Sequence, residues 1–162
     1  MKVILQDNKI IVFLNSQEKI NFEDKEQLNK YFKKIFIKLK KRYDLEFVGY
    51  YNIDIYKNKF GIILEIIDEE IDYYNYFNQV DMKINVYKNS DFLYQINYNF
   101  LDNDIIKNTI CYKNSDNIYL KVKKDINDIS LLKLREYSKI IYGDKVKEIL
   151  NKSKKVNLCK RM

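Results

Sequence analysis

The sequence predicts an α+β fold, in which antiparallel hairpins pack on one long amphipathic helix and are followed by further antiparallel strands and two short C-terminal helices. Two observations predict this class. Short runs of β-branched and aromatic residues, separated by polar turn residues, occur in the first 14 positions and again between residues 50 and 122. Helical periodicity occurs between these two regions and again after Ser130.

The first 14 residues predict a hairpin. The runs "KVIL" and "KIIVFL" flank Asp7-Asn8, two residue types that tolerate the left-handed conformation of a tight turn. Both faces of the hairpin are apolar. We therefore expect it to be buried on two sides or to lie in the centre of a sheet.

A helix is predicted from Lys25 to about Tyr43. Asp24 is a suitable N-cap, and Gln27 stands in the capping-box position three residues later. Apolar residues recur at helical spacing on one face, and lysines fall on the opposite face. The apolar face comprises Leu28, Phe32, Ile35 and Leu39, and the opposite face carries Lys30, Lys34, Lys38 and Lys41.

A second hairpin is predicted from "YYNIDIY" and "FGIILEI", which flank Asn58-Lys59. If these two residues form the loop, three apolar pairs share one face of the hairpin, and this face should cover the helix. The expected pairs are Ile55 with Ile62, Ile53 with Leu64 and Tyr51 with Ile66.

The rest of the chain predicts a second antiparallel sheet, or an extension of the first, followed by helices. The strand candidates are "MKINVY", "FLYQINY", "NTICYK" and "IYLKV". A helix is expected from Ser130 to Tyr142, with a left-handed cap at Gly143 and a further helix that begins at Asp144. We expect the last residues, "NKSKKVNLCKRM", to form a fraying basic tail.

The length of 162 residues fits one domain. We therefore expect residues 1–162 to form a single compact domain, or else two small halves, 1–78 and 79–162. The joint between such halves would lie in "DEEIDYYNYFN", residues 68–78, which has no sustained period.

A cytoplasmic location is expected. A strand-like run follows Met1 directly, where a secretory leader would have a basic and then an apolar segment. The longest apolar stretches are much shorter than a membrane-spanning helix, so no membrane insertion is expected. Cys111 and Cys159 have no metal-ligand spacing and suit a reducing compartment.

The composition argues against an enzyme. The chain has no His, which excludes Ser-His and Cys-His catalysis, and its 3 Gly are too few for a phosphate-binding glycine loop. The acidic run Asp68, Glu69, Glu70 and Asp72, with Asp81 further on, matches no calcium loop. We expect these acids to be solvated, and we expect no metal and no cofactor.

Two classes of partner remain open. Tyr73, Tyr74, Tyr76 and Phe77 form an aromatic cluster of the kind that anchors protein interfaces, and Ile37 projects among the helix lysines. Alternatively, the formal charge of +7 favours a nucleic-acid- or ribosome-associated protein, whose phosphate contacts would be Lys30, Lys34, Lys38 and Lys41. The abundance of Lys, Asn, Ile and Tyr is also typical of an AT-rich genome, which could account for much of this charge.

The segment "LREYSKIIYGDKVKEIL", residues 134–150, resembles the closing segment of the MecA-type adaptors, which deliver proteins to Clp unfoldases. The preceding "CYKNSDNIYLKV" is similar to the paired strands of that family. The resemblance implies a non-enzymatic, adaptor-like protein, and it makes Tyr137 and Lys139 candidate interface residues. The likeness is carried by Leu134, Glu136, Tyr137, Lys139, Ile141, Glu148 and Leu150.

Overall fold

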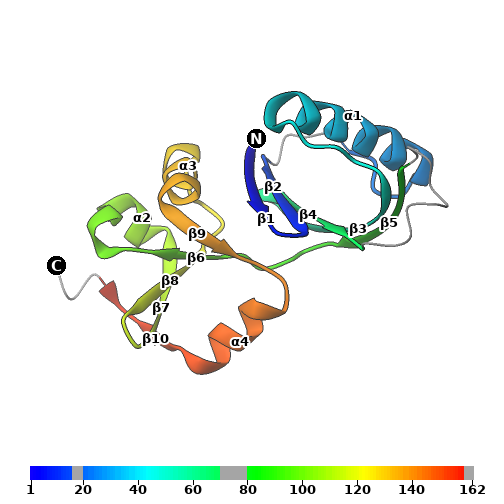
Figure 1. Ribbon diagram of the computed structural model, residues 1–162. Helices are drawn as coiled ribbons and strands as arrows, with labels where there is room; N and C mark the ends of the chain where they lie inside the picture. The colour runs from blue at the N-terminus through cyan, green and yellow to red at the C-terminus, as the bar shows by residue number, and fades with distance from the viewer. Residues whose placement is uncertain (16–19, 70–79, 159–162) are drawn as a thin grey trace. The chain divides into compact units, whose positions relative to one another are not determined.

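The computed structural model describes residues 1–15, 20–69 and 80–158. Helices and strands occur in both of its compact units, Met1–Asn89 and Ser90–Met162, so the predicted α+β class is confirmed (Figure 1). The division falls after Asn89, later than the boundary at residue 78 that the sequence suggested. The reason is that residues 80–87 pair with a strand of the first unit.

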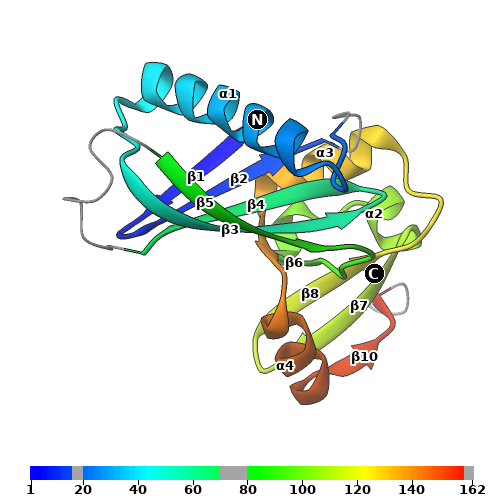
Figure 2. The same ribbon diagram turned by 90° about the vertical axis from the view of Figure 1, so that its right-hand side faces the viewer.

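The first unit is a five-stranded sheet with one helix on one face (Figure 2). Its strands lie in the order β1-β2-β4-β3-β5, and all neighbours are antiparallel except β3 and β5, which are parallel. The prediction of antiparallel strands was therefore wrong for β5. The elements are β1 (Lys2–Gln6), β2 (Lys9–Leu14), α1 (Lys25–Tyr43), β3 (Gly49–Asn58), β4 (Gly61–Asp68) and β5 (Val80–Tyr87).

Local signals define both ends of α1. Asp24 Oδ1 accepts hydrogen bonds from the backbone N–H groups of Glu26, at 3.0 Å, and Gln27, at 3.2 Å. At the other end, Asp44 takes the left-handed conformation with φ of 53° and donates its N–H to the Lys40 carbonyl. The helix consequently has the bounds that the sequence predicted.

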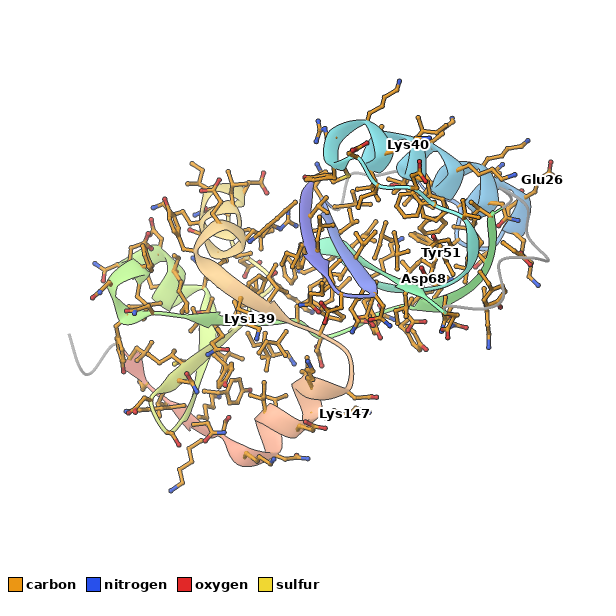
Figure 3. All side chains as sticks on the ribbon, viewed as in Figure 1. Glu26, Lys40, Tyr51, Asp68, Lys139 and Lys147 are labelled. Carbon is orange, nitrogen blue, oxygen red and sulfur yellow. The ribbon has the colours of Figure 1, made fainter. Side chains whose placement is uncertain are left out.

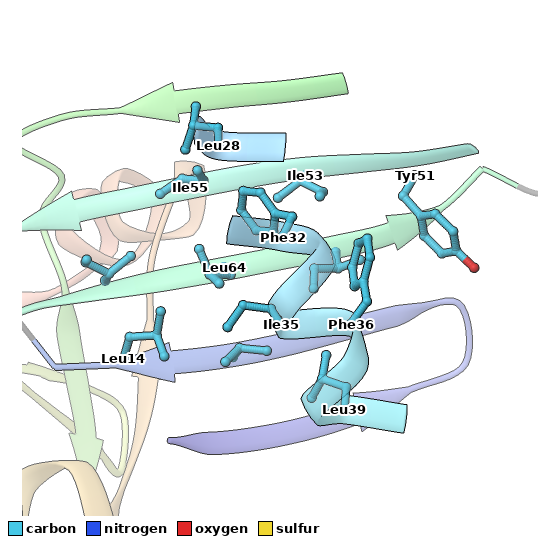
Figure 4. Close-up of a cluster of buried hydrophobic side chains, with 13 residues drawn as sticks. Leu14, Leu28, Phe32, Ile35, Phe36, Leu39, Tyr51, Ile53, Ile55 and Leu64 are labelled. Atoms are coloured by element: carbon cyan, nitrogen blue, oxygen red, sulfur yellow. The ribbon is translucent and has the colours of Figure 1, made fainter. Parts of the chain in front are cut away.

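The core of the first unit lies between α1 and the sheet (Figure 4). Phe32 and Leu39 are fully buried in the cluster between α1 and the sheet, and Phe36 stacks on Phe47 with 4.4 Å between ring centroids. The predicted packing of helix on hairpin is confirmed. Its members are Leu28, Phe32, Ile35 and Leu39 on the helix and Ile53, Ile55, Leu64 and Ile66 on the strands.

The register of the second hairpin differs from the prediction by two residues. Ile55 lies opposite Leu64, and Ile53 lies opposite Ile66. The turn falls at residues 59–60 because Asn58 Oδ1 accepts the N–H groups of Phe60, at 2.8 Å, and Gly61, at 3.1 Å. A shift of two residues keeps every side chain on its predicted face.

The first hairpin forms as predicted, with Gln6 opposite Lys9. Burial on two sides holds only in part, because β1 is an edge strand and its Leu5 is exposed. β2 lies inside the sheet, and residues 11–14 are buried.

The second unit is a five-stranded sheet in the order β10-β7-β8-β6-β9, whose paired neighbours are all antiparallel. Val146 of α4 packs with Leu93, Tyr119 and Ile141 of the sheet. The elements are β6 (Leu93–Ile96), η2 (Tyr98–Phe100), α2 (Asn103–Lys107), β7 (Thr109–Asn114), β8 (Asn117–Val122), α3 (Asp128–Tyr137), β9 (Ser138–Ile141), α4 (Asp144–Lys152) and β10 (Lys154–Val156).

The sequence missed three features of this unit. The helix expected to reach Tyr142 ends at Tyr137, because Ser138–Ile141 pairs with β6 as strand β9. The expected fraying tail instead contains β10, which pairs with β7, and the buried Leu158. The short helix α2 had no periodic signal because it is only five residues long.

No helix in the described ranges is both long enough and apolar enough to cross a membrane.

Truncating the core of the first unit should destabilise it strongly. Leu64 is fully buried between α1 and the sheet, so Leu64→Ala should lower the free energy of unfolding by about 2–5 kcal/mol. Urea denaturation followed by circular dichroism measures this change. Ile37→Ala is the control, because Ile37 lies on α1 but is exposed. This change should lower the free energy of unfolding by less than about 0.5 kcal/mol. Equal effects of the two changes would contradict the packing of α1 described above.

Candidate protein-binding surface

Helix α3 of the second unit is held through one face and leaves apolar side chains on another. Asn127 caps the helix by accepting the Ser130 N–H at 2.8 Å, and Leu134 is fully buried. By contrast, Ile129 is 71% exposed and Leu132 is 57% exposed. These two side chains contribute little to the core, although isoleucine and leucine are among the residue types most often buried.

Two exposed aromatic rings stack beside this helix. Tyr137, in the last turn of α3, lies against Phe100 of η2 with 4.8 Å between ring centroids and 7° between ring planes. Each ring remains about half exposed, at 51% and 47%. Stacking fixes the orientation of the two rings while their outer surfaces stay available. We call the group Tyr98, Phe100, Ile129, Leu132 and Tyr137 the η2–α3 surface; all five are exposed.

Sequence reasoning named Tyr137 but missed Phe100. Phe100 lies in the segment "NYNFLDND", and apolar residues interspersed with asparagines and aspartates were the available signal. Only folding brings η2 against α3, because Phe100 and Tyr137 are far apart in sequence.

Lys139 is exposed on β9, opposite Gln95 of β6. Both residues line a hollow of about 450 Å³ whose wall also includes Tyr98 of the η2–α3 surface and Asp116. Across it, Gln95 Nε2 donates to Asn117 Oδ1 at 3.0 Å. Lys139 therefore lies at a polar hollow that adjoins the aromatic residues.

The aromatic cluster predicted at Tyr73, Tyr74, Tyr76 and Phe77 lies outside the described residues, as do Glu70 and Asp72. Asp68 ends β4 and is half-buried, whereas Glu69 and Asp81 are exposed. Within the described ranges, no three Asp, Glu or Cys side chains gather as metal ligands.

The lysines predicted to contact nucleic acid are all exposed on one face of α1. Figure 3 labels Glu26 and Lys40 on this helix. Lys30 Nζ is 3.3 Å from Glu26 Oε1 of the preceding turn. Ile37 is 55% exposed in the middle of this face. We call the face the α1 basic face; it comprises Lys30, Lys33, Lys34, Lys38, Lys40, Lys41 and Arg42, all exposed.

Two groups with shifted pKa values, Tyr94 and Asp102, interact with charged side chains of α3. Burial raises the pKa of Tyr94 on β6 to about 12, although the nearby Arg135 guanidinium of α3 acts in the opposite direction. The Asp102 carboxylate caps α2 by accepting the Ile105 N–H at 2.8 Å and lies 2.9 Å from Lys133 Nζ of α3. The Ile105 hydrogen bond and the Lys133 ammonium hold the pKa of Asp102 below its ordinary value of 3.8.

Comparisons of the chain with protein-family models, with curated proteins and with solved structures found no match.

Removing the Asp102 carboxylate should weaken the second unit. Asp102→Ala removes the cap of α2 and should lower the free energy of unfolding by about 1 kcal/mol at neutral pH. Because the folded-state pKa is depressed, the carboxylate stabilises the fold above its ordinary pKa, and this contribution is lost as the pH falls through the lower folded value.

Urea denaturation between neutral pH and about pH 3 tests both statements. Asp102→Asn is the matched control, since asparagine can still cap the helix but does not titrate in this range. An unchanged loss of stability in acid for Asp102→Asn would show that Asp102 is not a source of the pH dependence.

Proposed function

We propose that this chain is a non-enzymatic protein-interaction protein of the adaptor type, which acts in the cytoplasm and contacts its partner through the η2–α3 surface. The observation that carries the proposal is the exposed Phe100–Tyr137 stack, together with the exposure of Ile129 and Leu132 on the same helix. Aromatic residues presented in this way are the usual anchors of protein interfaces.

The anchor residues are held in place before any partner arrives. Tyr137 is fixed by the stack on Phe100, and the C-terminal end of α3 is held by the Ser138 hydroxyl, which donates to the Leu134 carbonyl. Binding would therefore freeze few side-chain rotations, and more of the interaction free energy would appear as affinity.

The resemblance of residues 134–150 to the MecA-type adaptors gives the proposal a specific partner class, the Clp-type unfoldases. Tyr137 belongs both to the resembling segment and to the exposed stack. Lys139 follows it on β9 at the polar hollow, where it could pair with an acidic group of the partner.

Truncating the stacked rings should weaken the complex and spare the fold. Phe100→Ala and Tyr137→Ala should each raise the Kd for a Clp-type unfoldase by about 30-fold, equivalent to about 2 kcal/mol. Calorimetry with the purified unfoldase measures the Kd, and circular dichroism checks the fold. Tyr43→Ala is the control, because Tyr43 is exposed on α1 of the first unit.

The same variants also serve if the partner belongs to another class. Immobilised wild-type chain should retain a cytosolic protein, with and without nuclease treatment, that the Phe100→Ala/Tyr137→Ala double variant does not retain. If wild type and double variant retain the same proteins, the η2–α3 surface is not the binding site.

A second candidate function is nucleic-acid binding through the α1 basic face. The favouring observation is that seven basic side chains are exposed on one helix face, with Glu26 the neighbouring acid in the first turn. Such a face can displace condensed counterions from a phosphate backbone.

This alternative predicts a steep salt dependence. Each lysine removed from Lys30, Lys34, Lys38 and Lys41 should reduce the slope of log affinity against log salt by about 0.7–0.9. Fluorescence anisotropy with short DNA and RNA probes measures the slope, and Lys147→Gln, an exposed change on α4, should leave it unaltered. Absence of binding to either probe in low salt would exclude this function.

A further inference from the structure

Strand β5 is an open edge of the first sheet. It pairs with β3 on one side, and no strand among the described residues pairs with its other side (Figures 1 and 2). At eight residues it is much longer than the edge strands β9 and β10 of the second unit. An edge of this length offers a row of backbone groups to another strand.

Apolar surface accompanies the open edge. Val80, Met82, Ile84 and Val86 point toward the core cluster but are only half-buried. A hollow of about 700 Å³ lies at the start of this strand, and its wall includes Val80 together with residues of α1 and of the segment that follows it. A strand added beside β5 would cover the exposed parts of these four side chains.

The direction of the backbone groups along the edge can be assigned. The Met82 N–H donates to Asp81 Oδ1 of its own strand at 2.8 Å. A side chain of the same strand can accept this N–H only where no neighbouring strand takes it, so the Met82 N–H lies on the open side of β5. In a parallel ladder the N–H and C=O of one residue face the same neighbour, and alternate residues face alternate sides. The backbone N–H and C=O groups of residues 80, 82, 84 and 86 therefore point to the open side of β5, while their side chains pack against the core.

The sequence of this edge is complementary to itself. In "VDMKI", residues 80–84, the acid and the base stand on either side of Met82. When two such strands run antiparallel with Met82 opposite Met82, Asp81 of each lies opposite Lys83 of the other. Opposite charges in directly opposed positions stabilise a strand pair, whereas like charges destabilise it.

We propose that β5 is a self-association site, where a second copy of this chain adds its own β5 antiparallel and in the register that places Met82 opposite Met82. The two pairs of Asp81 and Lys83 occupy the non-hydrogen-bonded positions of this ladder, where side chains of opposed residues come closest. The product is a continuous sheet with a two-fold axis at Met82.

Other registers lose this complementarity. Residues whose backbone groups point outward must oppose each other, so the alternative registers shift the partner strand by two residues at a time. A shift by two residues places Lys83 opposite Lys83, and a shift by four places Asp81 opposite Tyr87. Only the register centred on Met82 pairs both charges and also places Val80 opposite Ile84.

The dimer should be weak and concentration-dependent, because pairing along a single edge buries less surface than a standard stable interface. It is independent of the proposed adaptor function, since no residue of the η2–α3 surface takes part. Failure of one proposal therefore leaves the other intact.

Charge reversal tests the proposed register. Sedimentation velocity over a range of micromolar concentrations should show a monomer–dimer equilibrium for the wild type. Asp81→Lys and Lys83→Asp each turn two attractive pairs into two repulsive ones, and each should raise the dimer Kd by about tenfold or more. An equimolar mixture of the two variants should dimerise, because each mixed pair again joins an acid with a base.

The mixture also controls for damage to the fold, since a misfolded variant could not regain association. Lys41→Asp, which makes the same charge change on exposed α1, should dimerise like the wild type. A wild type that stays monomeric throughout the range would overturn the proposal. So would single variants with an unchanged Kd, or a mixture that associates no better than its components.

Discussion

The packing of α1 on one face of the first sheet is the interaction on which that unit depends. Phe32 and Leu39 are fully buried in the core between α1 and the sheet, and burial of side chains of this size contributes roughly 1.5–3 kcal/mol each. Because its apolar face is buried against the sheet, the helix exposes the lysines of its opposite face to solvent, with Ile37 among them. The α1 basic face is thus a consequence of the core, and its charge becomes a functional signal only if phosphate or another polyanion binds there.

The second unit packs its helices differently and leaves apolar side chains of η2 and α3 exposed. Its sheet contacts α4 through Leu93, Tyr119 and Ile141, while Leu134 of α3 and Ile105 of α2 are buried elsewhere in the unit. Only one face of α3, which carries Leu134, is buried in the core. Ile129, Leu132 and Tyr137 of α3, with the rings of η2, remain exposed because nothing in the described part of this unit covers them. Exposed apolar area beyond the needs of the fold is the kind of feature that protein interfaces use.

Three surfaces with different chemistry therefore belong to two small units. The η2–α3 surface is aromatic and apolar, the α1 basic face is cationic, and the β5 edge offers backbone groups with one acid and one base. The proposals above assign each a different partner: a folded protein, a polyanion, and a second copy of the chain. Since their residues do not overlap, substitutions on one surface can be interpreted without disturbing the others.

The sequence by itself determined what depends on neighbours along the chain. Asp24 and the periodic apolar residues defined α1, and alternation assigned Ile53, Ile55, Leu64 and Ile66 to one face even though the turn was misplaced. It also identified Tyr137, but it could not pair it with Phe100. Only the tertiary structure decided the parallel pairing of β5, the strands β9 and β10, and the exposure of α3, because each of these depends on segments distant in the sequence. Alternation and capping reflect the local preference of the backbone. Strand order and exposure depend instead on which distant segment pairs with each strand edge or packs on each face.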